Sequence, residues 1–504
     1  MRLRIETLAT HDAGELLAQA ASRHYYAVFL QRFYHEGLAQ ASYMIACEAT
    51  GEAIVVDANR SLEAYLSTAA AHSFRITHVT ETHIHADYVS GSRDLARRTH
   101  AQLLLSAEGT EDWQYEFAQA DGARLLSDGD VIRVGRVELR VLHTPGHTPE
   151  HLTFVVTDTP TSSEPLGALT GDFIFVGDVG RPDLLERAAG IAGTMRDSAR
   201  QLFESLQRFT AAYPDHLQIW PGHGAGSACG RALGAVPMST LGYEKIANWA
   251  LQARDVEAFA VEVLGTQPDP PPYFAVMKRI NREGPSPMSA APLPRQAPGR
   301  LPAVLREGAM VLDVRATAAF GRGAIPGTIN LPLNTAFVSR AGWLVPYDRD
   351  VYVLSDDEDD TVAHAAAREL LLIGIDRVRG WFGADAYHNN DLPASQTVAH
   401  VSAAELARRV RSGEAAIIDV RNADEWQHGH IAGAVHVPLG RLREHVDTLP
   451  RDKQLVLHCA AGGRSAIGAS VLLAAGLTNV ANLEGGYAAW QAAGLPVSTD
   501  GDGA

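Results

Sequence analysis

Short runs of β-branched and aliphatic residues alternate with Ala- and Leu-rich stretches along most of the chain. In the first half, the apolar runs at 53–57, 78–82, 137–143 and 216–220 predict strands, and several lead directly into loops that carry His or Asp. Polar side chains at the ends of buried strands gather at one edge of a sheet, where binding and catalytic sites are usually assembled. The pattern therefore predicts an α/β domain with a site at a sheet edge.

The pattern changes after about residue 265. The stretch 265–302 is rich in Pro and poor in apolar periodicity. We therefore expect residues 266–300 to form an extended linker that separates the first domain from the rest of the chain.

The remaining chain contains an internal repeat. VLDVRATAAFGRGAIPGTINLPL (311–333) aligns without a gap with IIDVRNADEWQHGHIAGAVHVPL (417–439). A period this long indicates two tandem domains rather than a solenoid. In each copy, short β-branched runs alternate with Ala- and Leu-rich helical stretches, which predicts a parallel sheet flanked by helices. The two copies are expected to occupy 301–392 and 398–496.

Composition limits the kind of protein this is. The chain has 504 residues and a net charge of −16, and at about 150 residues per domain this length fits about three domains. The acidic balance argues against a binder of nucleic acid or of anionic membranes. No apolar run approaches the roughly 18 residues of a membrane span, and the N-terminus lacks the apolar stretch of a secretory signal.

Three distant cysteines (Cys47, Cys229 and Cys459) cannot build a disulfide framework, so we expect a cytoplasmic protein. The oligomeric state is left open, a homo-oligomer included.

Histidine and aspartate recur in four motifs of the first domain, each after a predicted strand. They are THIHADYVSG with His83, His85 and Asp87, TPGHTPEH with His147, LTGDFIFVGDVGRPD with Asp172 and Asp178, and WPGHG with His223. Imidazole and carboxylate together suit a borderline divalent metal. The motifs therefore predict a metal site.

The series HxHxD, PGHT, TGD and PGHG resembles the metallo-β-lactamase superfamily, whose fold is an αββα sandwich. The resemblance covers about residues 24–260, and we place the corresponding domain at 24–265. The full first motif of the superfamily is HxHxDH, whereas this chain has Tyr88 at the last position. That departure removes a ligand of a second metal and argues against paired zinc ions.

The motifs THIHADYVSG, TGDFIFVGDVGRPDLL and GHGAGSACG are more similar to the persulfide dioxygenase branch of this superfamily. The resemblance implies one Fe(II) held by His83, His147 and Asp172, with zinc as the alternative metal. Two His and one carboxylate leave positions open on iron for substrate and O₂ together. A small thiol persulfide and O₂ would be the substrates, and sulfite would be a product. The other polar side chains would orient the ligands, handle protons or act as alternative ligands: His85, Asp87, Asp178 and His223.

In the last domain, the predicted strand 454–458 runs into Cys459 and the loop AAGGRS at 460–465. Backbone N–H groups at a helix N-terminus and the charge of Arg464 favour a low-pKa thiol there. The whole unit resembles the rhodanese (thiosulfate sulfurtransferase) family. This implies that Cys459 takes sulfane sulfur from a persulfide and passes it to sulfite, giving thiosulfate. Asp419 and Arg421, on the D-V-R signature, would be structural.

The middle domain has the rhodanese pattern without its chemistry. Ser355 aligns with Cys459, and the acidic positions 357–360 align with its loop. Such a loop would repel a thiolate, so we expect a degenerate, inactive rhodanese domain that spaces or docks the other two. Cys229 is interpreted either as a buried small residue or as a sulfur relay near the iron, and Cys47 as a core residue.

Together these features resemble a persulfide dioxygenase–sulfurtransferase fusion. Two other functions are considered. One is a zinc-dependent thioester hydrolase of the glyoxalase II type fused to a sulfurtransferase. The other is a sulfur carrier whose metal domain has no oxygenase activity. Neither the carrier thiol nor the route of sulfur between the domains is visible in the sequence.

Overall fold

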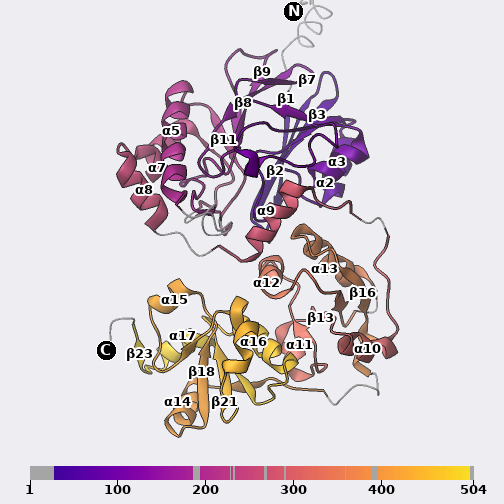
Figure 1. Ribbon diagram of the computed structural model, residues 1–504, viewed down its shortest axis with the longest axis vertical. Coiled ribbons are helices and arrows are strands. Elements are labelled where there is room, and N and C mark those ends of the chain that lie inside the picture. The colour runs from indigo at the N-terminus through magenta and orange to yellow at the C-terminus, as the bar shows by residue number, and fades with distance from the viewer. Residues whose placement is uncertain are drawn as a thin grey trace, which may run out of the picture.

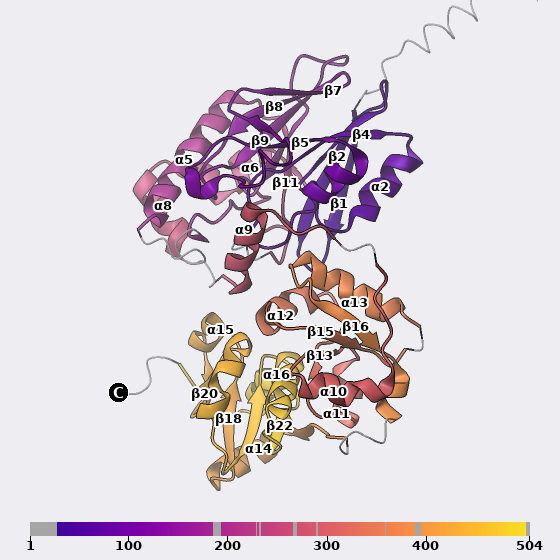
Figure 2. The ribbon, with the colours of Figure 1, turned by 45° about the vertical axis from the view of Figure 1, so that its right-hand side comes forward.

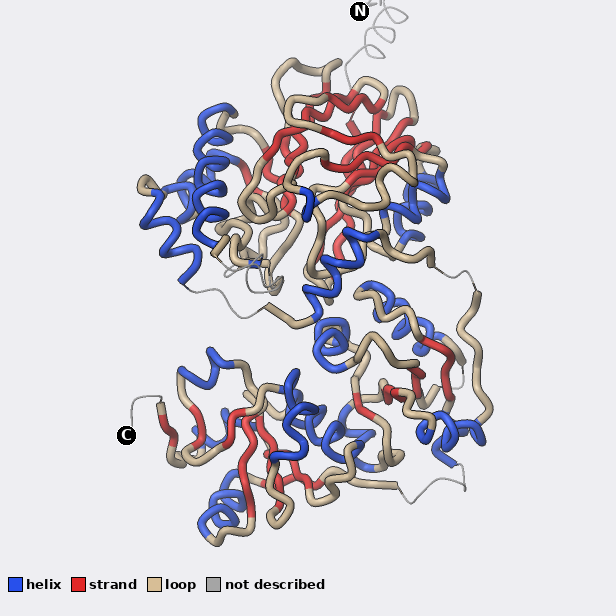
Figure 3. Tube along the Cα trace, viewed as in Figure 1, coloured by secondary structure: helices blue, strands red, loops and turns tan. Residues whose placement is uncertain are grey.

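Two six-stranded mixed sheets pack face to face in the first domain (Figures 1 and 3). The first sheet has the order β1-β2-β3-β4-β5-β6 and the second β12-β11-β10-β9-β8-β7. The strands of the first sheet are β1 (Val28–His35), β2 (Gln40–Cys47), β3 (Glu52–Val56), β4 (Arg75–Thr80), β5 (Gln102–Ser106) and β6 (Arg124–Leu126). Those of the second sheet are β7 (Val131–Val134), β8 (Val137–His143), β9 (Leu152–Asp158), β10 (Gly167–Gly171), β11 (Gln218–Pro221) and β12 (Ser239–Thr240).

Helices cover the outer faces of both sheets. The first sheet carries α2 (Leu62–Ala71) and α3 (Ser92–Thr99), and the second carries α5 (Met195–Ala212), α6 (Leu241–Ala247), α7 (Trp249–Gln252) and α8 (Val256–Gly265). Strand β2 shows how the sequence directs this layering. Met44 and Ala46 belong to the core under α2 and α3, whereas Tyr43 and Ile45 belong to the core between the sheets, because successive side chains of a strand point to opposite faces. The predicted αββα sandwich is confirmed.

The computed structural model describes residues 28–184, 193–227, 229–230, 233–265, 270–288, 291–357, 359–388 and 395–499. The predicted start of the first domain at residue 24, and Glu358 of the acidic loop, lie outside these residues. Within the described residues, no helix is both long and apolar enough to span a membrane.

The segment expected to be an extended linker contains a helix, α9 (Tyr273–Glu283). Tyr273, Phe274 and Met277 are buried on one side of it. Pro270–Pro272 directly precede the helix, where proline is tolerated because the first N–H groups of a helix have no intrahelical partner. The expectation of extended structure is wrong for Tyr273–Glu283. The many prolines of the segment suggested a linker, although this part of it forms a short amphipathic helix.

The middle and last domains share one parallel-sheet topology. The middle domain has the order β14-β13-β15-β16, and the last has β17-β22-β21-β18-β20. The middle elements are α10 (Leu301–Arg306), β13 (Met310–Asp313), α11 (Thr317–Arg322), β14 (Ile329–Asn330), α12 (Phe337–Leu344), β15 (Val351–Leu354), α13 (Thr361–Leu372) and β16 (Val378–Phe382). The last elements include β17 (Ala399–Val401), α14 (Ala403–Arg411), β18 (Ala415–Asp419), α15 (Ala423–Gln427), β19 (His430–Ile431), β20 (Val435–His436), the 3₁₀ helix η4 (Leu439–Thr448), β21 (Gln454–His458), α16 (Gly463–Ala474), β22 (Val480–Leu483), α17 (Gly486–Ala492) and β23 (Val497–Ser498).

The repeated Asp-Val-Arg motif forms the same buried ion pair in both domains. Arg315 Nη2 lies 2.7 Å from Asp313 Oδ2, and Arg421 Nη2 lies 2.6 Å from Asp419 Oδ2. Both carboxylates are fully buried at the ends of equivalent strands. This geometry fits the structural role that the sequence suggests for the pair.

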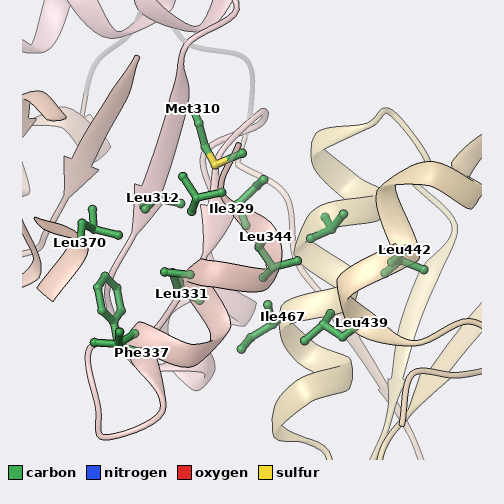
Figure 4. Close-up of a cluster of buried hydrophobic side chains, with 14 of the residues drawn as sticks. Met310, Leu312, Ile329, Leu331, Phe337, Leu344, Leu370, Leu439, Leu442 and Ile467 are labelled. Atoms are coloured by element: carbon green, nitrogen blue, oxygen red, sulfur yellow. The ribbon is translucent and has the colours of Figure 1, made fainter. Parts of the chain in front are cut away.

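The middle domain lies between the other two in both ribbon views (Figures 1 and 2). On one side, the buried guanidinium of Arg60 lies 2.5 Å from the Asp376 carboxylate. On the other side, the Asn330 amide donates to the Ser470 hydroxyl at 3.0 Å. Apolar side chains from the middle and last domains also form one continuous cluster (Figure 4). The middle domain therefore contacts both neighbours.

Candidate metal and sulfur-transfer sites

The strand-end motifs of the first domain converge at one end of the sandwich. His83 follows β4, His147 follows β8, and Asp172 follows β10. Each offers one ligand atom, and these atoms lie within 4.8 Å of one another. The Nε2 atoms of His147 and His83 lie 3.4 and 3.9 Å from Asp172 Oδ2. The structure thus brings the three residues singled out from the sequence into one buried group.

Each imidazole of this group is held through its other ring nitrogen. His83 Nδ1 lies 2.9 Å from the Thr82 hydroxyl, and His147 Nδ1 lies 3.0 Å from the Arg181 carbonyl oxygen. Partners of this kind set the ring orientation and tautomer of a metal-binding histidine. Both Nε2 atoms are therefore turned toward the carboxylate.

The donors fit a single divalent ion. Both carboxylate oxygens of Asp172 are buried, and neither has a hydrogen-bond partner among the described residues, although such groups are costly unless paired or bound to a metal. Burial and the neighbouring His85 hold the pKa of His83 well below its usual value, and burial also lowers the pKa of His147. A neutral imidazole is the form in which histidine binds a metal ion.

A second buried group lies directly beside the first. The ligand atoms of Asp87, His223 and Cys229 lie within 4.8 Å of one another. His223 Nε2 lies 3.4 Å from Asp87 Oδ2 and 3.5 Å from Asp172 Oδ1. Burial, together with the carboxylates of Asp87 and Asp172, raises the pKa of the Cys229 thiol well above its usual value. Cys229 is thus both buried and next to the candidate metal site, as its two interpretations require.

Three other residues of the motifs face different partners. His85 Nε2 lies 3.1 Å from Asp57 Oδ1, and the Tyr88 hydroxyl donates to the Asp57 carbonyl oxygen at 3.2 Å. Asp178 Oδ1 accepts a hydrogen bond from the Trp249 indole at 2.8 Å. Although burial lowers the pKa of His85, the Asp57 carboxylate raises it to about 9. None of the three belongs to the two groups of potential ligands among the described residues.

Sequence reasoning missed three residues that support the site. The Asp57 carboxylate accepts hydrogen bonds from the backbone amide and the hydroxyl of Thr82. His151 Nε2 accepts a hydrogen bond from the backbone amide of Asp172 at 3.1 Å. The side-chain amide of Asn281, on α9, donates to two carbonyl oxygens of the loop 85–88. Asp57 ends a predicted strand and His151 lies in the motif TPGHTPEH, so the sequence pattern could have indicated both residues. No sequence pattern indicated Asn281, because the segment that forms α9 was interpreted as a linker.

In the last domain, backbone N–H groups of the loop 460–465 donate hydrogen bonds to the Cys459 thiol. Cys459 follows β21, and its Sγ accepts a hydrogen bond from the Gly462 amide at 3.1 Å and from the Ser465 hydroxyl at 3.5 Å. Gly462 has a φ of 101°, a left-handed conformation that favours glycine. Although burial raises the pKa of the Cys459 thiol, hydrogen bonds from Ser465, Ala461 and Gly462 lower it overall. The low-pKa thiol expected from the sequence has a structural cause.

Arg464 interacts with the Cys459 thiolate and also with a carboxylate that the sequence did not reveal. Its two terminal nitrogens bind the Glu425 carboxylate at 2.6 and 2.7 Å. Such a bidentate pair offsets much of the guanidinium charge. Sequence reasoning did not find Glu425 as a partner of Arg464 because it lies on α15, 39 residues away in the sequence.

Ser465→Ala should raise the pKa of Cys459 by about one unit. A hydrogen bond to a charged acceptor contributes about 1.5–3 kcal/mol, and one pKa unit corresponds to about 1.4 kcal/mol. Because the thiolate is the reactive form, alkylation of Cys459 should then require higher pH. Peptide mass spectrometry of iodoacetamide-treated protein across a pH series measures the midpoint. An unchanged midpoint would show that the backbone alone sets the pKa.

Comparisons with known proteins agree with this architecture. Residues 35–209 match the model of the metallo-beta-lactamase superfamily, and residues 402–493 match that of the rhodanese-like domain. The crystal structure of a metallo-beta-lactamase from Staphylococcus aureus subsp. aureus COL is 40% identical with a TM-score of 0.65. The match covers 71% of this chain, which is more than any one of its domains, and 99% of that protein.

Two curated relatives match the first domain. The probable polyketide biosynthesis zinc-dependent hydrolase BaeB of Bacillus velezensis is 25% identical over 210 residues, which are 42% of this chain and 84% of the relative. The hydroxyacylglutathione hydrolase of Nitrosococcus oceani is 30% identical over 183 residues, which are 36% of this chain and 61% of the relative. This chain belongs to the metallo-β-lactamase superfamily through its N-terminal domain and carries a rhodanese domain at its C-terminal end.

Proposed function

We propose that the chain oxidises a low-molecular-weight thiol persulfide with O₂ at a single iron(II) ion and transfers sulfane sulfur through Cys459. In the first reaction, persulfide, O₂ and one water give the free thiol, sulfite and two protons. The observation that most supports this proposal is the group of His83, His147 and Asp172. Two His and one carboxylate form the ligand set typical of iron(II) oxygenases. Tyr88, which replaces the final His of the superfamily motif, directs its hydroxyl to Asp57 instead.

Iron(II) at this site would supply the one-electron chemistry by which O₂ reacts with a persulfide. The protein's own contribution is to orient the ligands in a site shielded from bulk water. Thr82 and the Arg181 carbonyl hold the two imidazoles, and all three ligand side chains are almost fully buried. Asp87 and His223 lie next to Asp172, where they can accept the protons that the reaction releases.

The second reaction needs no metal. The Cys459 thiolate first takes the outer sulfur of a small-thiol persulfide, which releases the free thiol. The resulting Cys459 persulfide donates this sulfur to sulfite: the new S–S bond forms as the bond to Sγ breaks, which leaves the Cys459 thiolate and thiosulfate. Hydrogen bonds from the Ala461 and Gly462 amides stabilise that thiolate, which makes it a better leaving group. The sulfite made in the first domain would be consumed by the last.

A zinc-dependent thioester hydrolase is the second candidate, favoured by the similarity to BaeB and to the hydroxyacylglutathione hydrolase. Metal-depleted protein reloaded with Fe(II) or Zn(II) separates the two candidates. We expect the iron form to consume O₂ when given glutathione persulfide, and the zinc form to leave S-lactoylglutathione intact. Rapid thioester hydrolysis by the zinc form, without O₂ uptake by the iron form, would support the hydrolase. Inactivity of both forms, with sulfur exchange intact, would support a sulfur carrier.

The middle domain should take no part in sulfur transfer chemistry. Ser355 occupies the position after β15 that Cys459 occupies after β21, and its hydroxyl donates to Asp357 Oδ2 at 3.1 Å. Ser355→Ala should therefore leave thiosulfate production unchanged, because a serine beside a carboxylate is a poor sulfur acceptor. A tenfold fall, about 1.4 kcal/mol in the barrier, would contradict the assignment of this domain as inactive.

A further inference from the structure

The turn 371–376 of the middle domain, where α13 ends, contacts the loop 85–90 of the first domain. The Val89 amide donates a hydrogen bond to the Leu372 carbonyl oxygen at 2.7 Å. Gly374 packs so closely that a Cβ there would lie 2.9 Å from the Ile280 side chain and 3.1 Å from that of Val89. The middle domain is therefore bonded to the first domain two residues after Asp87.

Helix α9 holds the same loop through a second set of hydrogen bonds. The nitrogen of the buried Asn281 amide donates to the carbonyl oxygens of His85 and Tyr88 at 2.8 and 2.7 Å. The oxygen of that amide accepts from the Ser90 backbone at 2.9 Å. Helix α9 lies at the boundary between the first and middle domains in both ribbon views (Figures 1 and 2). A Cβ at Gly374 would meet two of its side chains, so the turn contacts both the loop and the helix that binds the loop.

A buried arginine of the first domain fixes the position of this turn. Arg60 Nη1 lies 2.5 Å from the Asp376 carboxylate and donates to the Leu371 carbonyl oxygen at 3.1 Å. Its Nη2 donates to the Ser286 carbonyl oxygen at 3.0 Å. The Arg60 side chain is 1% exposed, and a buried charge is costly unless it is paired and hydrogen-bonded. Displacement of the turn would therefore leave this guanidinium without its partners.

Asp87 depends on the loop for its position. Its carboxylate is buried, and neither oxygen has a hydrogen-bond partner in the part of the chain that the structure describes. No donor fixes the side chain, so the loop backbone places it 3.4 Å from His223 Nε2. That backbone is in turn bonded to α9 and to the turn 371–376.

We propose that the turn 371–376 is a positioning element of the metal site, so that the domain without a catalytic cysteine shapes the site of the first domain. Loss of a contact that supports a metal site typically lowers metal affinity or activity about 10–100-fold. The effect on O₂ uptake rests on the proposed function. The effect on the conformation of the loop does not.

Hydrogen exchange in the metal-free, full-length chain, measured by peptide mass spectrometry, tests this positioning directly. Gly374→Val should speed exchange in the loop 85–90 about tenfold, because the larger side chain pushes the turn away from Val89. Gly308→Val is the matched control in the same domain. Gly308 also has a positive φ, 82°, but a Cβ there would meet nothing within 4 Å. Peptides from β8 and β9 should exchange as in the parent chain, which separates a local effect from a general loss of stability.

Asp376→Ala loosens the same contact by a different route. It leaves the Arg60 guanidinium without its carboxylate, whereas Asp350→Ala removes a carboxylate whose arginine partners lie within the middle domain. The two carboxylates are similarly exposed, at 40% and 38%. Asp376→Ala should speed exchange in the loop and lower both iron affinity and O₂ uptake about tenfold. Asp350→Ala should change none of these, and sulfur exchange at Cys459 should persist in both variants.

Three results would overturn the proposal. They are unchanged exchange in the loop 85–90 after both substitutions, an equal rise in the matched controls, and a loosened loop with unchanged iron affinity. Faster exchange with weaker iron binding, in a protein whose parent chain consumes no O₂, would count against the proposed function alone.

Discussion

Cys459→Ser should abolish thiosulfate formation while persulfide-dependent O₂ uptake continues. Serine keeps the size of the side chain, so the loop that follows β21 should retain its fold. A hydroxyl has a far higher pKa than a thiol and cannot carry a persulfide. Removing the nucleophile should lower sulfur transfer by at least about a thousandfold. Sulfite should therefore accumulate as the end product.

Product analysis by thiol-reactive fluorescent labelling and chromatography, run beside an oxygen electrode, measures both quantities. Ser355→Ala is the matched control, because it alters the equivalent position of the middle domain. If thiosulfate still dominates where free persulfide and sulfite do not react unaided, another residue carries the sulfur, and Cys229 is the next candidate. If O₂ uptake collapses in folded, iron-loaded Cys459→Ser, this thiol acts before the iron site.

Loss of any member of the group of His83, His147 and Asp172 should abolish both iron binding and O₂ uptake. His83→Ala and His147→Ala each remove a nitrogen ligand, and Asp172→Asn removes the carboxylate charge. Two remaining ligands are too few for a weak iron(II) site. We expect O₂ uptake to fall by more than about a hundredfold, beyond the effect of losing a supporting hydrogen bond. Sulfur exchange at Cys459 should survive in all three variants.

Asp178→Asn provides the matched control for Asp172→Asn. Both residues lie in the same motif, and asparagine can still accept the hydrogen bond that Trp249 donates to Asp178. Iron content by elemental analysis should be lost in Asp172→Asn and kept in Asp178→Asn. The reverse result would mean that the wrong carboxylate has been assigned to the metal.

The metal group could be predicted because its residues stand at the ends of strands. Strand positions follow from local hydrophobic pattern, and His83, His147 and Asp172 each come shortly after one. The supporting contacts could not be predicted in the same way. Asn281 and the loop carbonyl it binds at His85 are 196 residues apart. No local pattern reports such a contact, and the prolines before α9 suggested a linker instead.

The electrostatics of the sulfur-transfer loop show the same limit. The loop after β21 was recognisable because Cys459, the glycines and the following helix are consecutive. The partners of Arg464 come from different elements: it interacts with the Cys459 thiolate of its own loop and with Glu425 of α15. Charge balance of this kind is decided by tertiary packing, so sequence reasoning identified Arg464 without its carboxylate partner.

Oxygen-isotope labelling of the sulfite is the most direct test of the proposed oxygenase. Iron-loaded Cys459→Ser would be given glutathione persulfide under ¹⁸O₂, with monobromobimane present to trap sulfite as it forms, and the adduct analysed by mass spectrometry. The balanced reaction takes two oxygen atoms of each sulfite from O₂ and one from water, so the adduct should carry two labelled atoms. Sulfite without label, or no sulfite from a fully iron-loaded chain, would contradict the assignment of the first domain as a persulfide dioxygenase.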